Sequence, residues 1–213
     1  MRFEEGIEPK YKKAIEDALG AIIATGNDEH RMVANAILAS DMLMRVAPVS
    51  EVKASGVTGV SNWFMTNRRI ADQPLSINEA LAEVYMKIAS ETIDGGPRAV
   101  EGTFVHEGRH AYDFARLIAS FSEADEKPLS IFDPTMYELE WAAHVAAGEY
   151  MLLVGKEEYV AEGCDLMILG RGGDGRCFLW NEGIECRLRD GYGLTPVDNP
   201  GQLTSELLRL KER

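Results

Sequence analysis

Apolar side chains recur every three or four positions along much of this chain, and this period is typical of amphipathic helices. The clearest case is residues 9–24, where Pro9 occupies a first turn that tolerates proline. The same period predicts helices over residues 27–43, 79–90 (capped by Asn78), 98–121, 133–154 (capped by Asp133) and 204–213. A short helix after Gly155 is also compatible with the pattern.

Two segments have a different pattern. After Ser50 the chain is rich in glycine, β-branched and aromatic residues, which predicts a strand over residues 57–65. Cys177 and Cys186 flank a second segment, which predicts a β-hairpin that follows the glycine-rich residues 170–175. The glycine run lacks the Gly-Lys-Ser/Thr ending of a phosphate-binding loop, so it is interpreted as a loop at the start of the hairpin.

Together these elements predict one α+β domain over residues 1–213, mostly helical with a small antiparallel sheet. A chain of this length can bury a sizeable core. The expected parts are N-terminal helices (1–48), a strand region (50–66), two central helices (97–155), and a C-terminal hairpin and helix (156–213).

Charge and composition narrow the function. The chain has 35 acidic and 22 basic residues, a formal net charge of -13, and this charge argues against nucleic acid as a partner. No apolar run approaches the roughly 18 residues of a membrane helix, and the first residues lack the pattern of a secretory signal. We therefore expect a soluble, cytoplasmic protein without a membrane partner, and the sequence does not predict its oligomeric state.

Cysteine usage agrees with a reducing compartment. Cys164, Cys177 and Cys186 are too few for a disulfide scaffold, and no Cys-x-x-Cys pair is present. Free thiols are the simpler interpretation. A disulfide between Cys177 and Cys186, across the predicted hairpin, is the alternative.

The strongest chemical signal is a His-Glu-x-x-His motif at His106, Glu107 and His110. Inside a helix, positions four apart share one face with Cβ atoms about 5–6 Å apart, so both imidazoles can reach one divalent ion. Zinc accepts such ligands and lowers the pKa of a bound water toward about 7, and the adjacent Glu107 can take the proton from that water. The alternative is a helix whose histidines face solvent.

A catalytic zinc needs a third protein ligand. The helix predicted over 133–154 carries Tyr137, Glu140 and His144 on one face. We predict Glu140 as the third ligand, and His144 as either a rival ligand or a group that supports the metal or stabilises an oxyanion beside it. Tyr137 and Tyr112 are candidate donors to the same oxyanion, with core packing as the alternative for both.

These residues resemble the zincin metallopeptidases, and within them the gluzincins, whose third zinc ligand is a glutamate on a later helix. The resemblance rests on the His-Glu-x-x-His motif and on residues 138–143, which are similar to the Glu-x-Glu-Ala-Asp pattern of several gluzincin families. It implies a zincin-like active-site helix, zinc held by His106, His110 and Glu140, and Glu107 as the general base. The matched segments cover about a quarter of the chain.

The resemblance also implies an edge strand, here within residues 57–65, that pairs with an extended peptide substrate. Trp141 and Ala142 depart from the pattern, because they replace an alanine and an acidic residue. A carboxylate that supports a metal ligand must then come from elsewhere, and Asp113 is a candidate. Arg109 is interpreted as a residue at the surface or behind the metal ligands, with binding of a substrate carboxylate as the alternative.

The resulting hypothesis is a zinc-dependent metallopeptidase in which a zinc-bound water, deprotonated by Glu107, attacks a bond of a peptide or protein substrate. A second hypothesis is a catalytically inactive module with the zincin-like fold that recognises a protein partner. A third is a zinc hydrolase of non-peptide substrates. The sequence does not indicate the cleavage specificity.

Overall fold

The computed structural model describes residues 1–123, 132–161 and 167–210. Its elements in chain order are β1 (Arg2–Phe3), α1 (Pro9–Thr25), α2 (Asp28–Ala39), β2 (Leu43–Ala47), α3 (Val49–Val52), β3 (Gly56–Val60), α4 (Trp63–Asp72), α5 (Ile77–Leu81), β4 (Val84–Ala89), α6 (Ser90–Asp94), α7 (Pro97–Glu123), α8 (Met136–Val154), α9 (Lys156–Ala161), β5 (Leu169–Arg171), β6 (Cys177–Leu179), α10 (Asn181–Arg187), the π-helix η1 (Leu188–Tyr192) and α11 (Thr204–Leu207).

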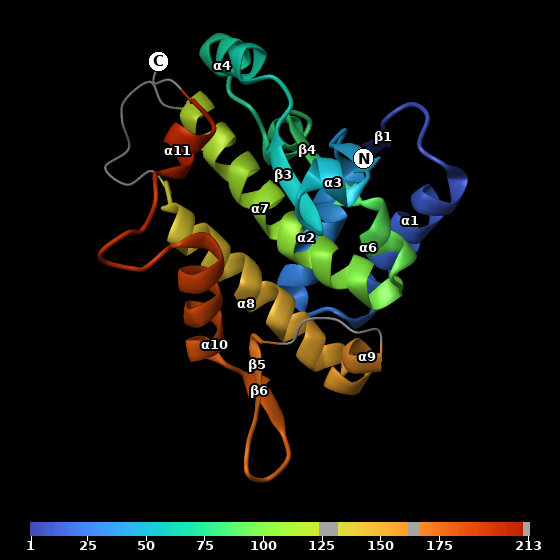
Figure 1. Ribbon diagram of the computed structural model, residues 1–213. Helices are drawn as coiled ribbons and strands as arrows, with labels where there is room; N and C mark the ends of the chain where they lie inside the picture. The colour runs from blue at the N-terminus through green and yellow to red at the C-terminus, as the bar shows by residue number, and fades with distance from the viewer. Residues whose placement is uncertain (124–131, 162–166, 211–213) are drawn as a thin grey trace.

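The long helix α7 lies at the centre of the fold, between the main sheet and α8 (Figure 1). Helices α1, α2 and α5 also pack on α7, whereas α10 and η1 pack on α8. The predicted class, mostly helical α+β, is confirmed. No helix in the described part of the chain is both long and apolar enough to span a membrane.

The main sheet has the strand order β1-β2-β4-β3. Strands β1, β2 and β4 run parallel, and β3 pairs antiparallel with β4. The sheet is therefore mixed, whereas the second sheet, β5-β6, is antiparallel as expected. Strand β3 forms one edge of the main sheet and lies against α7.

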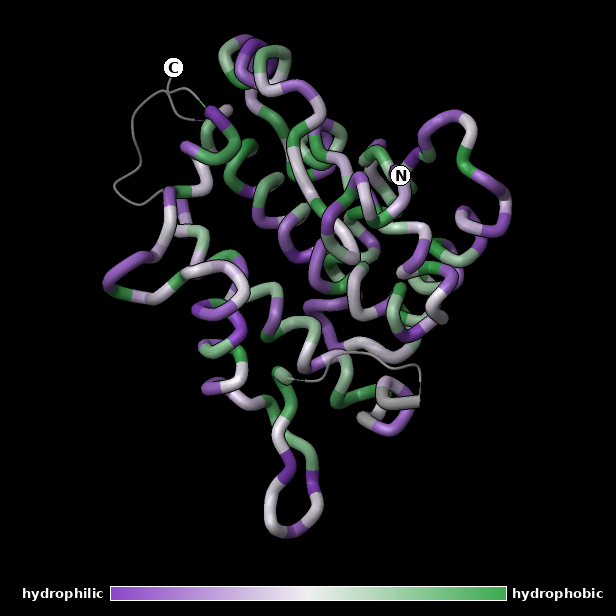
Figure 2. Tube along the Cα trace, viewed as in Figure 1, coloured by the Kyte–Doolittle hydropathy of each residue, from purple (hydrophilic) through white to green (hydrophobic). Residues whose placement is uncertain are grey.

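The core surrounds α7, which explains why this helix has buried residues on several of its faces. Small residues let other elements approach it. Ala143 and Ala147 of α8 are buried where the two long helices meet, and a Cβ added to Gly108 would lie 3.4 Å from Ile37 of α2. In Figure 2, hydrophobic and hydrophilic residues alternate along α7, so one helix serves both the core and a polar site.

One predicted helix ends earlier than expected, and another contains a strand. The helix predicted over 27–43 ends at Ala39, and residues from Leu43 onward form β2. The helix predicted over 79–90 is a short α5, capped by Ser76 rather than Asn78, followed by β4. Both strands are internal to the sheet. In β4 the residues Val84, Met86 and Ile88 are buried and Tyr85 and Lys87 are half-buried, so this segment has the two-residue alternation of a strand, which the helical prediction overlooked.

The strand predicted over 57–65 is only partly correct. Strand β3 ends at Val60, and Trp63 begins α4, because the side chain of Asn62 accepts a hydrogen bond from the main-chain nitrogen of Met65 and caps a helix.

The start of α8 also differs from the prediction. Thr135, not Asp133, is its N-cap, and Glu138 completes a capping box.

The C-terminal region follows a different order from the prediction. The hairpin lies earlier, in β5 and β6. The glycine run 170–175 begins in β5 and continues into the turn, whereas residues 181–187 are helical. Cys177 and Cys186 are free thiols, and Cys164 lies outside the described residues. Helix α11 ends at Leu207, and the last three residues of the predicted 204–213 helix lie outside the described part.

Candidate metal centre

His106 and His110 lie one turn apart on α7, as the motif predicts. Their ring centroids are 4.7 Å apart, and their Nε2 atoms face each other at 3.2 Å. His110 is buried and His106 is half-buried. Helix formation alone therefore brings two imidazole nitrogens to one point.

Glu140 reaches the same point from α8. One of its carboxylate oxygens, Oε2, lies 3.4 Å from His106 Nε2, and the other, Oε1, lies 3.5 Å from His110 Nε2. Glu140 is only 8% exposed. The buried small residue Ala143, one turn further along α8, permits this close approach of the two helices.

The spacing of these three groups fits a divalent ion. Ligand atoms about 2.0–2.1 Å from a tetrahedral zinc lie about 3.3 Å from one another. The two Nε2 atoms are 3.2 Å apart, each lies 3.4–3.5 Å from a different oxygen of Glu140, and one ligand atom from each residue can be chosen so that all three lie within 4.8 Å of one another. Glu140 Oε2 is buried and makes no hydrogen bond with the described residues. Two imidazoles and a carboxylate are a donor set that zinc accepts.

The charges at the centre favour an ionised carboxylate. Burial opposes ionisation of Glu140, but the adjacent His106 and His110 hold the pKa of Glu140 well below its usual range. Burial likewise opposes protonation of His110, and the Glu140 carboxylate nevertheless raises the pKa of His110. An ionised carboxylate is the form in which Glu140 could bind a divalent ion.

Glu107 lies beside the three groups, on the side of α7 that faces β3. It is buried, and Thr58 of β3 donates a hydrogen bond of 2.8 Å to its Oε2 atom. Strand and helix are very close here, because a Cβ added to Gly56 would lie 2.8 Å from Glu107 Cγ. The carboxylate next to the ligands is thus held by the edge strand.

His144 is close to the centre without being part of the triangle. Its ring lies 4.6 Å from that of His106, and its Nε2 atom is buried without a hydrogen-bond partner among the described residues. Burial, and then the charges of His106 and Arg187, lower the pKa of His144 to about 3. His144 is therefore a neutral imidazole at physiological pH.

Tyr192 is a residue of this region that sequence reasoning missed. It lies at the end of the π-helix η1, which continues α10, and its ring is 6.2 Å from that of His144. Burial, and then the negative charge of Glu140, raise the pKa of Tyr192 to about 12. Neither the π-helical turn nor its packing on α8 has a local sequence signal, although π-helical turns are frequent at functional sites.

The structure places the other two predicted tyrosines elsewhere. Tyr137 stacks on Trp141, with ring centroids 5.9 Å apart, and burial raises its pKa. Tyr112 is directed at Met32, whose sulfur is 3.7 Å from the hydroxyl. Neither tyrosine is among the described residues that line the cavity at the metal centre.

Asp113 and Arg109 form an ion pair with each other. Arg109 Nε donates to Asp113 Oδ2 at 2.7 Å, and the same guanidinium pairs with Glu29 of α2. His110 Nδ1 is buried without a hydrogen-bond partner in the described part of the chain. The expected support of a ligand by Asp113 is therefore not a direct hydrogen bond here.

A cavity of about 610 Å³ opens beside the metal centre. Its floor is the side of α7 that carries residues 98–107, and Gly56 at the start of β3 lies on one wall. It is also lined by the side chains of His106, Glu107, His144, Arg187 and Tyr192. A volume in this range suits a ligand of several residues or a drug-sized molecule.

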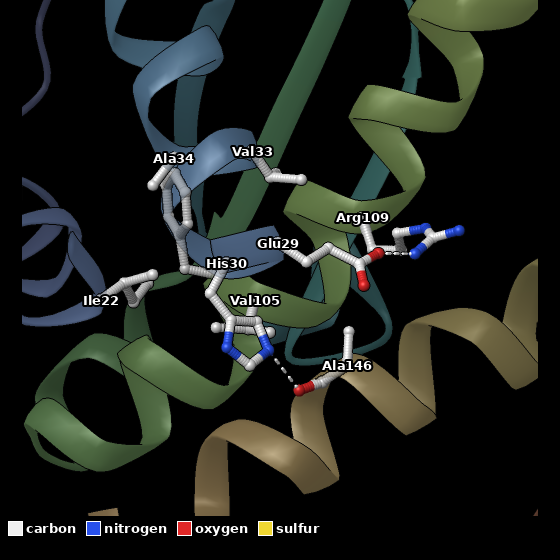
Figure 3. A pocket seen from close by; sticks show the side chains of 9 residues that line it. Ile22, Glu29, His30, Val33, Ala34, Val105, Arg109 and Ala146 are labelled. Atoms are coloured by element: carbon white, nitrogen blue, oxygen red, sulfur yellow. Dashed lines mark hydrogen bonds and ion pairs between the residues drawn. The ribbon is translucent and has the colours of Figure 1, made fainter. Parts of the chain in front are cut away.

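The fourth histidine, His30, is held by hydrogen bonds to main-chain atoms. Its Nε2 atom lies 2.9 Å from the carbonyl oxygen of Ala146, and its Nδ1 atom accepts a hydrogen bond from the main-chain nitrogen of Asn27. Figure 3 shows its ring directed at Ala146, next to the ion pair of Glu29 and Arg109. The adjoining cavity is only about 20 Å³, about the size of one water molecule.

Comparison with known proteins adds no assignment to this geometry. No family model matches the chain, and no curated protein or solved structure matches it either.

Proposed function

We propose that this chain is a zinc-dependent metallopeptidase. The observation that carries the proposal is the cluster of His106, His110 and Glu140, whose ligand atoms lie within 4.8 Å of one another, together with the adjacent carboxylate of Glu107. Zinc in this position supplies a Lewis acid that acidifies water and polarises a carbonyl group. All other steps belong to side chains of the chain itself.

Glu107 is the general base. Its carboxylate accepts a proton from the water that attacks the carbonyl carbon, and returns that proton to the nitrogen of the leaving amine. The restricted position of Glu107 beside β3 supports this role, because a base must be within hydrogen-bond reach of the proton it takes.

His144 and Tyr192 stabilise the negative charge that develops on the carbonyl oxygen. A neutral imidazole with an unpartnered, buried Nε2 atom can carry a hydrogen into the cavity, and a tyrosine whose pKa is raised to about 12 keeps its proton. Donors fixed in a site shielded from water stabilise an oxyanion without reorganisation. Tyr137, the donor proposed from the sequence, stacks on Trp141 and is not among the described residues that line the cavity.

A peptide is favoured as the substrate by the edge strand. The carbonyl oxygen of Ser55 accepts a hydrogen bond of 2.9 Å from the main-chain nitrogen of Ala89 at the end of β4. The main-chain nitrogen of Ser61 donates one of 2.8 Å to the carbonyl oxygen of Glu83, just before β4. Hydrogen-bonded positions alternate in an antiparallel pair, so the main-chain groups of Gly56, Thr58 and Val60 point away from β4. An extended peptide can pair with those groups next to the metal centre.

The first experiment is elemental analysis of the purified protein. We expect about one zinc per chain, lost in both His106→Ala and Glu140→Ala and retained in His144→Ala. Retention of zinc in Glu140→Ala together with its loss in His144→Ala would instead assign the third ligand to His144.

The second experiment compares the zinc-loaded wild type with Glu107→Gln on a mixture of peptides, with amide and ester compounds as further substrates. We expect peptide cleavage by the wild type, and a loss of about 100-fold or more in the variant with its zinc retained. Full activity in Glu107→Gln would refute the base assignment. Zinc binding without cleavage of any compound would favour a binding module, and cleavage of esters alone would favour another hydrolase.

A further inference from the structure

The hydroxyl group of Thr58 is bound to the proposed general base. Thr58 Oγ1 lies 2.8 Å from Glu107 Oε2 and 3.1 Å from the carbonyl oxygen of Glu107. A hydroxyl group has one hydrogen to donate, and a charged carboxylate oxygen is the stronger acceptor of the two. Oε2 of Glu107 thus accepts the Thr58 hydrogen bond, and Oε1 is the oxygen that Thr58 does not engage.

The direction of the Thr58 side chain follows from the strand. Side chains alternate between the faces of a sheet, so Gly56 and Thr58 share a face. That face meets α7, because a Cβ added to Gly56 would lie 2.7 Å from Thr103 Cγ2 and 2.8 Å from Glu107 Cγ. A residue larger than glycine at position 56 would separate strand from helix and draw the Thr58 hydroxyl away from Glu107.

The main chain of Thr58 faces in a different direction from its side chain. Its main-chain groups point toward the free edge of β3, as the alternation of hydrogen bonds with β4 requires. One residue therefore presents its main chain to the edge where a peptide would pair, and its side chain to the carboxylate that acts on that peptide.

We propose that Thr58 is a positioning residue that fixes the Glu107 carboxylate relative to a peptide paired with β3. This inference rests on the proposed function, since it assigns Glu107 the role of base. The hydroxyl group restricts Glu107 to one orientation, with Oε1 toward the attacking water. When the substrate pairs with the main chain of Thr58, the scissile bond and the Glu107 carboxylate are both positioned by the same residue.

The test uses two substitutions in the full-length, zinc-loaded protein. Thr58→Val keeps the shape of the side chain and removes the donor, whereas Thr58→Ser keeps the donor. We expect Thr58→Val to lower kcat about 10- to 100-fold with KM and zinc content nearly unchanged, because a misplacement of about 1 Å can have an effect of that size. Thr58→Ser should restore kcat to within about threefold of the wild type.

Thr66→Val is the matched control. The hydroxyl of Thr66 also contacts a glutamate, Glu83, at 2.8 Å and a main-chain carbonyl, that of Asn62, at 3.0 Å, but it lies on α4 outside the site. This variant should lose comparable stability and keep its kcat. A kcat in Thr58→Val within twofold of the wild type would overturn the proposal, as would a Thr58→Ser variant as slow as Thr58→Val.

A crystallographic comparison decides the question without turnover. In zinc-loaded Thr58→Val, the Glu107 carboxylate should leave its position beside β3, and in Thr58→Ser it should keep that position. An unchanged carboxylate in Thr58→Val would contradict the positioning role. If the wild type binds zinc and cleaves nothing, the proposed function fails, and this comparison still shows whether Thr58 orients Glu107.

Discussion

Two buried polar clusters between α7 and α8 differ in whether their polar atoms have hydrogen-bond partners. Glu101, which is 3% exposed, accepts hydrogen bonds from Arg98 at 2.6 Å and from the Tyr150 hydroxyl at 2.9 Å. Less than two turns further along, the metal centre leaves Glu140 Oε2 and His144 Nε2 without a hydrogen-bond partner in the described part of the chain. Both clusters are buried, but only the first is complete within the protein.

We interpret this difference as the one between a structural cluster and a candidate functional one. A buried polar atom without a partner costs about 1–3 kcal/mol of folding free energy, so several at one place are a sign that the partner comes from outside the chain. His30 and His144 show the same contrast, since His30 uses both ring nitrogens in hydrogen bonds with protein atoms. Each prediction below tests this distinction.

Zinc should have the largest effect. A ligand that binds only the folded state at about 1,000 times its Kd raises the free energy of unfolding by about 4 kcal/mol. We expect an increase of that size in the wild type, and in Glu101→Leu, when urea unfolding with zinc is compared with unfolding in a chelator. In Glu140→Ala the increase should be mostly absent. Equal increases in all three proteins would place the bound zinc elsewhere.

Removal of Glu101 should have the next largest effect. Glu101→Leu leaves Arg98 and the Tyr150 hydroxyl without their shared acceptor, and we expect a loss of about 2–3 kcal/mol in stability. The loss should be the same with and without zinc, because this cluster is complete without a metal. Chemical denaturation measures it, and a loss that depends on zinc would show that the two clusters are coupled.

Substitution of the two buried histidines should change stability in opposite directions. His30→Leu leaves the Asn27 nitrogen without its acceptor and removes the hydrogen bond that the Ala146 oxygen makes outside its own helix, so we expect a loss of about 1–3 kcal/mol. His144→Leu removes a buried nitrogen that has no partner, so the metal-free protein should gain about 1 kcal/mol. Thermal unfolding in the presence of a chelator measures both. Destabilisation of similar size in the two variants would remove the contrast.

The smallest expected effect is a pH dependence. Burial lowers the pKa of His30 from its usual value of 6.5, against the opposing effect of Ala146 and the charges of Glu149 and Glu29. The unfolded chain therefore binds the proton first, so the contribution of His30 to stability is complete above pH 6.5 and is lost as the pH falls below it. The slope cannot exceed about 1.4 kcal/mol per pH unit for one group.

The measurement is the difference in unfolding free energy between the wild type and His30→Gln from pH 8 to pH 5. A difference that stays constant over this range would mean that the pKa of His30 is the same in the folded and the unfolded chain.

The parts of the site that depend on local spacing could be predicted. An interval of four residues in a helix fixes the relation of His106 to His110, and the same interval places Glu140 and His144 on one face of α8. The choice between Glu140 and His144, and the position of Tyr137, depends on the rotation of α8 about its axis. That rotation is set by packing against α7, which no local pattern encodes.

The contributions from other elements could not be predicted. Thr58 meets Glu107 because β3 packs on α7, and Tyr192 reaches the centre through the π-helical turn after α10. The errors in the fold have a similar origin. The segment of β4 has buried residues at every second position, Val84, Met86 and Ile88, but it is short and closely follows the helical residues of α5, so the prediction extended that helix through it.

The contact at Gly56 has an evolutionary consequence. A homologue with a side chain at this position must hold β3 further from α7, because a Cβ there would lie 2.7 Å from Thr103 Cγ2 and 2.8 Å from Glu107 Cγ. Position 56 should therefore covary with position 103 and with position 58. The combination of Gly56 and Thr58 with the motif on α7 is a more selective signature for finding relatives than the five-residue motif alone.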